Sequence, residues 1–238
     1  DYLICDICIS TLIYKLRKTT MKKTFILITV AMLALAGKAY AEMSYGVTAA
    51  LTKISASGTE TENQERTSAD ADNTVVIPSV FVEYAFSDTV SLGLDYIPLT
   101  ADVSDKTKKR TDTETSVAGT DASTSLTRNQ SANAELENHI TLYSNYQMND
   151  TLYAKVGVAF VTLNTTETLN TGAKYGNEDI YGGVFGIGAA DGPHRFEIVY
   201  TDYEDISITS SVARTGVTGN NKIEADLDTM AFRYSYAF

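Results

Sequence analysis

The stretch that decides the fold is the last one of the chain, Thr229-Met-Ala-Phe-Arg-Tyr-Ser-Tyr-Ala-Phe238. Large apolar or aromatic side chains occupy every second position: Met230, Phe232, Tyr234, Tyr236 and Phe238. Because successive side chains of a β-strand point to opposite faces, this period of two predicts a strand with one apolar face. A soluble domain usually ends in a frayed, exposed segment. A last strand this apolar therefore indicates a face that meets lipid rather than water.

The same alternation recurs seven times upstream, each time with aromatic, β-branched or Gly residues on one parity and polar residues on the other. The seven segments are residues 45–52, 76–86, 90–96, 135–146, 152–160, 181–189 and 195–201. Together with the last stretch they predict eight strands. Each of the eight has one predominantly apolar face.

The connections between these segments alternate strictly in length. Three are tight turns, at residues 87–89, 147–151 and 191–194. Four are long and rich in Thr, Ser, Asp and Asn, near residues 55–73, 100–133, 164–179 and 206–222. This order places every short turn at one end of the sheet. An outer-membrane barrel has that asymmetry, with short periplasmic turns and long extracellular loops. The sequence therefore predicts an all-β chain, an eight-stranded antiparallel up-and-down transmembrane β-barrel.

Charged side chains gather on the face opposite the apolar one, which in a barrel of eight strands faces a lumen that side chains can fill. The candidate lumen residues are Glu83, Asp95, Glu135, Glu137, His139, Lys155, Arg195, Glu197 and Arg233. Buried charges of opposite sign are expected to pair, because an unpaired one is costly. The favoured interpretation is a polar plug. The alternative is a narrow, porin-like pathway for ions or small solutes, whose acidic excess would favour cations.

The N-terminal region is expected to lie outside the barrel. Residues 21–41 combine Met-Lys-Lys, a short apolar core and Ala39-Tyr-Ala41, the pattern of a cleavable secretory signal peptide. Residues 1–20, which hold both cysteines, are interpreted as an upstream leader. Without residues 1–41 the chain has 13 basic and 28 acidic residues, a net charge of −15 instead of −11. That balance argues against nucleic acid as a partner, since polyanions need a cationic surface. Two His and no Cys remain, and we expect no metal and no cofactor.

The signal peptide, the eight strands, the alternating loops and the final Tyr-Ser-Tyr-Ala-Phe238 resemble small Gram-negative outer-membrane proteins of the OmpA/OmpX type. The resemblance covers residues 42–238 at the level of architecture and brings no catalytic motif with it. It implies a monomer exported to the outer membrane, where lipids and lipopolysaccharide surround it. It also implies that periplasmic chaperones and the barrel assembly machinery recognise the last strand, from Met230 to Phe238, as an assembly signal.

Two further hypotheses stand beside this one. His139, with acidic neighbours, is the one candidate for a lipid-modifying enzyme at the outer rim, but generic Ser and Thr alone would have to complete the set. We therefore expect a non-enzymatic protein with a structural or surface-interaction role. A basic patch at residues 106–110 is either a solvated loop or a contact for lipopolysaccharide phosphates.

Overall fold

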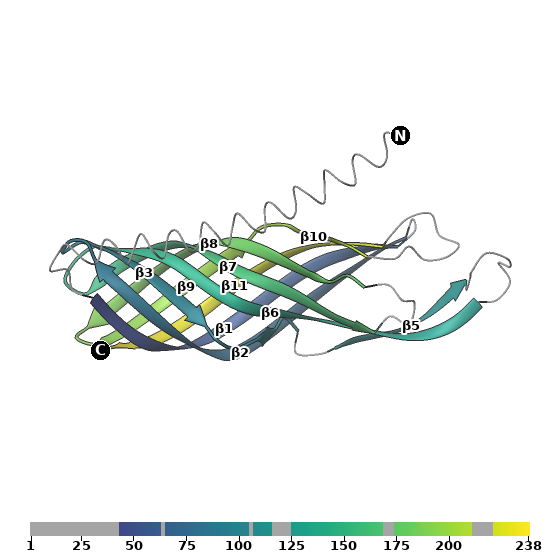
Figure 1. Ribbon diagram of the computed structural model, residues 1–238, viewed down its shortest axis with the longest axis horizontal. Helices are drawn as coiled ribbons and strands as arrows, with labels where there is room; N and C mark the ends of the chain where they lie inside the picture. Colours follow the sequence, from purple (N-terminus) through teal and green to yellow (C-terminus); the bar gives the residue numbers. More distant parts are fainter. Residues whose placement is uncertain (1–42, 63–64, 105–106, 116–124, 169–173, 211–220) are drawn as a thin grey trace, which may run out of the picture. The chain divides into compact units, whose positions relative to one another are not determined.

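The computed structural model describes residues 43–62, 65–104, 107–115, 125–168, 174–210 and 221–238. These residues form strands joined by turns and short irregular segments (Figure 1). The strands are β1 (Met43–Glu62), β2 (Glu65–Ala85), β3 (Val90–Ile97), β4 (Ala101–Asp102), β5 (Lys108–Thr115), β6 (Ser125–Gln147), β7 (Leu152–Thr168), β8 (Asn177–Asp191), β9 (His194–Tyr203), β10 (Ile206–Thr209) and β11 (Lys222–Ala237). Within the described residues, no helix has both the length and the apolar character that a membrane crossing requires.

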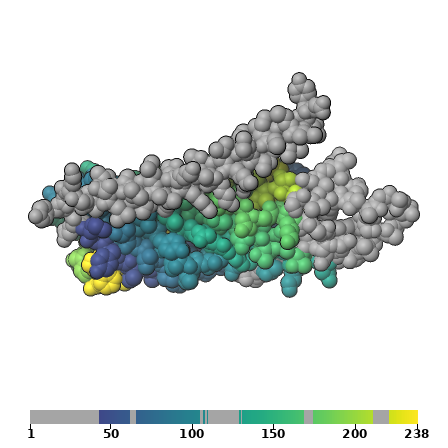
Figure 2. Space-filling model, viewed as in Figure 1, coloured from purple at the N-terminus to yellow at the C-terminus, as the bar shows by residue number. Residues whose placement is uncertain are grey.

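Eight of the strands close into a ring. The antiparallel order is β1-β2-β3-β6-β7-β8-β9-β11, and β11 pairs with β1 to complete it. The closing register runs from Gly46↔Ala237 to Thr61↔Lys222. Figure 2 shows the first residues of β1, in purple, beside the last residues of β11, in yellow. The all-β, eight-stranded, up-and-down barrel predicted from the sequence is confirmed.

The two ends of the ring differ as the connections predicted. At one end, called the turn end here, tight turns join β2 to β3, β6 to β7 and β8 to β9. In the last of these turns Gly192 has φ +55°, a left-handed conformation that favours glycine. At the opposite end, the loop end, β4 and β5 pair with β6 beyond β3, and β10 pairs with β11 beyond β9.

The predicted bounds of the long loops are wrong, because strands continue far into them. β1 and β2 pair without a break from Met43↔Tyr84 to Glu62↔Glu65, through most of residues 55–73. In the same way β5 and β6 occupy much of 100–133, β7 extends into 164–179, and β10 lies within 206–222. The polarity of these segments suggested loops. The hydrogen bonds between two strands, however, need only backbone groups, and Thr is a favourable strand residue.

The faces of the ring are inverted relative to a soluble protein. The outward positions carry large apolar side chains, so that Ile187 is 62% and Phe232 54% exposed. The inward positions carry charges, so that Lys155 and Glu197 are each only 4% exposed. An apolar belt around the whole ring would be unfavourable in water, whereas it is favourable in contact with the hydrocarbon of a bilayer. The exposed belt therefore marks the lipid-facing surface of the barrel.

A β-bulge in β6 changes which residues face the lumen. The pairing with β7 shifts between Glu137 and Ile140, and Asn138 adopts φ +54° there. On the loop-end side of the bulge Leu136 is buried in the interior; on the turn-end side Thr141 and Tyr143 are. A bulge adds one residue to one strand and so reverses its parity.

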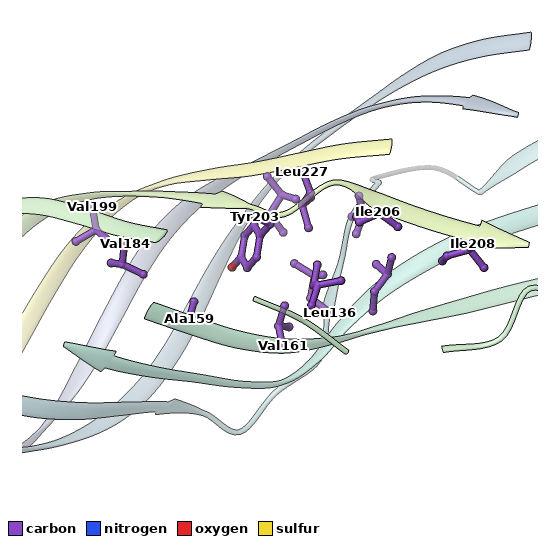
Figure 3. Close-up of a cluster of buried hydrophobic side chains, with 13 residues drawn as sticks. Leu136, Ala159, Val161, Val184, Val199, Tyr203, Ile206, Ile208 and Leu227 are labelled. Carbon is purple, nitrogen blue, oxygen red and sulfur yellow. The ribbon is translucent and has the colours of Figure 1, made fainter. Parts of the chain in front are cut away.

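Apolar side chains fill the interior towards the loop end. Figure 3 shows Leu136, Val161, Tyr203 and Leu227 directed into the space that the strands enclose. They belong to one cluster of buried residues contributed by β1, by β6 to β11 and by the residue after β4: Ile54, Val103, Leu136, Ala159, Val161, Leu163, Ile180, Val184, Val199, Tyr203, Ile206, Ile208 and Leu227. The lumen thus has a charged half near the turn end and an apolar half near the loop end.

Candidate functional site: an ion-pair network and two cavities inside the barrel

Six charged side chains from five strands meet inside the ring towards the turn end: Glu83, Asp95, Lys155, Arg195, Glu197 and Arg233. They are called the ion-pair network below. Arg233 lies at its centre. Its guanidinium donates to Asp95, and its Nε lies 3.4 Å from Glu197 Oε2. Glu197 also pairs with Lys155. Two cations and two carboxylates are therefore joined in one chain of contacts.

A second ion pair extends the network towards the turns. Arg195 donates to Glu83 Oε2 at 2.8 Å. The same oxygen accepts from Tyr143 Oη at 3.2 Å and from Asn145 Nδ2 at 2.9 Å. On the other side Tyr153 Oη donates to Glu197 Oε1 at 2.9 Å. Because several donors surround each buried carboxylate, the desolvation of its charge is offset locally.

Two tyrosine rings fill the space between the ion pairs, and glycines on neighbouring strands make room for them. The Lys155 ammonium lies 4.1 Å from the centre of the Tyr143 ring, a cation–π contact. A Cβ at Gly93 would collide with this ring, and one at Gly188 would collide with the ring of Tyr153. The inward glycines are therefore part of the packing of the plug.

Three of the nine sequence-derived candidates lie outside this network. Glu135 and Glu137 precede the bulge, so they point to the outer side of β6, where Asn164 Nδ2 donates to Glu137 Oε1 at 3.2 Å. Their assignment to the lumen is wrong, because it assumed an unbroken period of two through Asn138. Tyr143, Tyr153 and Asn145 were not among the candidates, although they share the inward parity of the charges.

His139 faces the lumen but contacts a tyrosine instead of an acid. Its Nε2 forms a 2.9 Å hydrogen bond with Tyr203 Oη, and its Nδ1 is buried without a partner. It borders a cavity of about 70 Å³ between the ion-pair network and the apolar cluster, together with Asp95 and Arg233. This place inside the ring, against a tyrosine, gives no support to a catalytic histidine at the outer rim.

A larger cavity, of about 250 Å³, lies within the apolar half of the lumen and is called the loop-end cavity. Its walls include the small residues Ala56, Gly58, Ala69, Ala71, Ala132, Ala134 and Ala225 and the larger Leu163, Tyr175, Ile206, Ile208, Ile223 and Leu227. Side chains this small on inward positions leave the space unfilled. The cavity was not predicted from the sequence, because most of these small residues lie in segments whose polarity had indicated loops.

The remaining candidates are placed as follows. The side chains of Met230, Phe232, Tyr234, Tyr236 and Phe238 belong to the outward belt, and the amide of Phe238 donates to Tyr45 O at 2.7 Å. Their role as an assembly signal stays a prediction. Residues 1–41 lie outside the described residues, as do Lys106 and the side chains of Lys108 and Arg110 in the basic patch. Among the described residues, no group of His, Cys, Asp and Glu could hold a metal ion.

Comparison with known proteins agrees with this architecture. No family model and no curated protein sequence matches the chain. Among solved structures, it is similar to the outer membrane protein OprG from Pseudomonas aeruginosa, with 13% identity and a TM-score of 0.50 over 83% of this chain and 97% of that one. It is also similar to the outer membrane protein AlkL in lipid bilayers (14% identity, 85% and 93% covered, TM-score 0.42). A third is the Ail protein of Yersinia pestis (7% identity, 81% and 99% covered, TM-score 0.33). The likeness to OprG is one of fold. Together with the closed ring and the apolar belt, it shows that the chain has the eight-stranded β-barrel fold of bacterial outer-membrane proteins.

Proposed function

We propose that the protein is a non-conducting outer-membrane barrel with a structural or surface-interaction role. The observation that supports this best is the ion-pair network, which fills the lumen between the turn end and the cavities. In the orientation that we propose, the short turns face the periplasm and the loop end faces the outside of the cell, as in other outer-membrane barrels. Outer-membrane lipid and lipopolysaccharide are then the surroundings of the belt.

The network opposes conduction for two reasons. First, its side chains together with Tyr143 and Tyr153 fill an interior that in an eight-stranded barrel is only wide enough for side chains. Second, each acid has a cation at contact distance, so that a passing ion would have to displace a paired charge. Separating a buried pair costs about 3–5 kcal/mol. A resting pore for ions is therefore disfavoured both sterically and electrostatically.

Planar-bilayer recording of the folded protein tests this proposal. We expect no conductance steps from the native protein. The double variant Tyr143→Ala/Tyr153→Ala, which removes both rings but keeps every charge, should produce small steps. The exposed variant Tyr146→Ala on the lipid face serves as the matched control and should remain silent. Regular, cation-selective steps from the native protein would overturn the proposal in favour of the narrow pore.

A further inference from the structure

The loop-end cavity contains a buried carboxylate oxygen that has no hydrogen-bond partner. Glu167 lines the cavity, and on β7 it shares the inward side of Leu163, which is buried in the apolar cluster. Its Oε1 accepts from the Tyr175 amide at 2.9 Å, whereas its Oε2 is buried and unsatisfied. The carboxylate is thus held at one oxygen and leaves the other without a partner.

The orphaned oxygen of Glu167 is a hydrogen-bond acceptor. A buried acceptor without a partner is unfavourable, and more so when it is charged. A ligand that donates a hydrogen bond at this place would remove that penalty.

Among the described residues that line the cavity, Glu167 is the one charged side chain that faces it. Asp70 and Asp226 also border it, but both pair with Ser57, and this register places them on the outer side of the ring. The rest of the lining is mostly aliphatic, from Ala56 on β1 to Leu227 on β11. An anion would be repelled here, and a purely apolar molecule would leave the second oxygen of Glu167 unpaired.

We propose that the loop-end cavity is a binding site for a small amphipathic cation, an amine with a compact apolar body. The ammonium group donates to Glu167 Oε2, and the apolar body packs against Leu163, Ile206 and Leu227. Since an apolar cavity of about 150 Å³ accommodates benzene, a cavity of about 250 Å³ has room for roughly ten non-hydrogen atoms. Ala69 and Ala132 of the lining are exposed, so the cavity is reachable from solvent.

Binding of three probes of similar size to the protein in phosphatidylcholine nanodiscs tests this proposal. The probes are cyclohexylmethylamine, cyclohexylmethanol and cyclohexanecarboxylate at pH 7, measured by saturation-transfer NMR against empty nanodiscs. We expect the amine to bind about tenfold more tightly than the alcohol, because a charge-assisted hydrogen bond is roughly twice as strong as a neutral one. The carboxylate should show no binding.

Two variants locate the site. Glu167→Gln should remove most of the preference for the amine, whereas Glu137→Gln, on the outer side of the neighbouring strand, should leave it unchanged. Ala225→Leu, or Ala56→Leu if the first variant does not fold, should fill the cavity and abolish binding of every probe. Equal binding of amine and carboxylate, or an amine preference that survives both Glu167→Gln and the filled cavity, would overturn the proposal. Bilayer recording on the same preparations separates this result from the closed lumen, because binding and conduction can fail independently.

Discussion

Replacing Arg233 with methionine should destabilise the barrel by about 3–5 kcal/mol, the cost of removing one partner from a buried ion pair. The arginine side chain is 12% exposed, and its partners Asp95 and Glu197 are 2% and 3% exposed. Glu197 keeps Lys155 in the variant, whereas Asp95 keeps only the Ser79 hydroxyl at 3.0 Å. The penalty therefore falls mainly on Asp95, whose charge remains buried without a cation.

A double variant separates the charge from the packing. Arg233→Met/Asp95→Asn removes both charges, and it should recover most of the loss, because replacing a whole buried pair is often close to neutral. Lys53→Met is the matched surface control. Its ion pair with Asp72 spans 3.5 Å, but the two side chains are 59% and 65% exposed. An exposed pair contributes about 0–1 kcal/mol.

The assay is urea unfolding of protein folded into zwitterionic vesicles, followed by far-ultraviolet circular dichroism. The chain has no tryptophan, so the usual fluorescence signal of barrel insertion is absent. If Arg233→Met costs no more than Lys53→Met, the network does not stabilise the lumen and the reasoning fails. A double variant as unstable as the single one would show that the loss comes from packing rather than from charge.

Three further variants can be measured by the same unfolding assay. Asn138→Val should cost about 1–2 kcal/mol and Asn138→Gly almost nothing, because φ +54° strains a β-branched residue; equal losses would contradict the bulge. Gly188→Ala should cost about 1–3 kcal/mol, since its Cβ collides with the Tyr153 ring; unchanged stability would mean that the ring lies elsewhere. Phe232→Arg should cost about 2–4 kcal/mol if the belt lies near the bilayer midplane, and a loss below 1 kcal/mol would place it outside the hydrocarbon.

The ring and the inward position of most of its charges could be predicted from the sequence, because both depend on a period of two. Arg233, Asp95, Lys155 and Glu197 share the inward parity of their strands, and the structure brings them together. The tight turns fix which strands are neighbours and in which direction they run. Within the network the register pairs Arg233 with Glu197 on neighbouring strands. The other ion pairs join strands that are not neighbours, so they depend on side chains that reach across the lumen.

The bulge in β6 could not be predicted from a periodic pattern. Nothing in Glu135-Leu-Glu-Asn-His139 distinguishes an unbroken strand from one with an extra residue at Asn138. Asparagine tolerates a left-handed conformation, which makes the bulge possible but does not require it. The shift reversed Glu135, Leu136 and Glu137 together, since all three precede it.

The extended strands at the loop end were missed for a different reason. Their inward residues are small: Ala69 lies opposite Gly58, and Ala71 lies opposite Ala56. These small residues alternate with Asp, Ser and Thr along the strands. Small side chains contribute little apolar area, so polarity dominates the pattern and predicts loops. Hydrogen bonding along a long hairpin supports these strands instead, and the small side chains leave the loop-end cavity.

Site-directed spin labelling along β11 can determine whether the apolar belt of the inverted barrel faces lipid. Single cysteines would be placed at positions 229 to 236 in protein with Cys5 and Cys8 replaced by serine, and collision rates measured with oxygen and with a polar nickel complex. We expect a period of two, with Met230, Phe232, Tyr234 and Tyr236 reached by oxygen from the bilayer and Thr229 and Ser235 shielded. Outward positions that collide instead with the polar complex would show that this face meets water, and would contradict the membrane barrel.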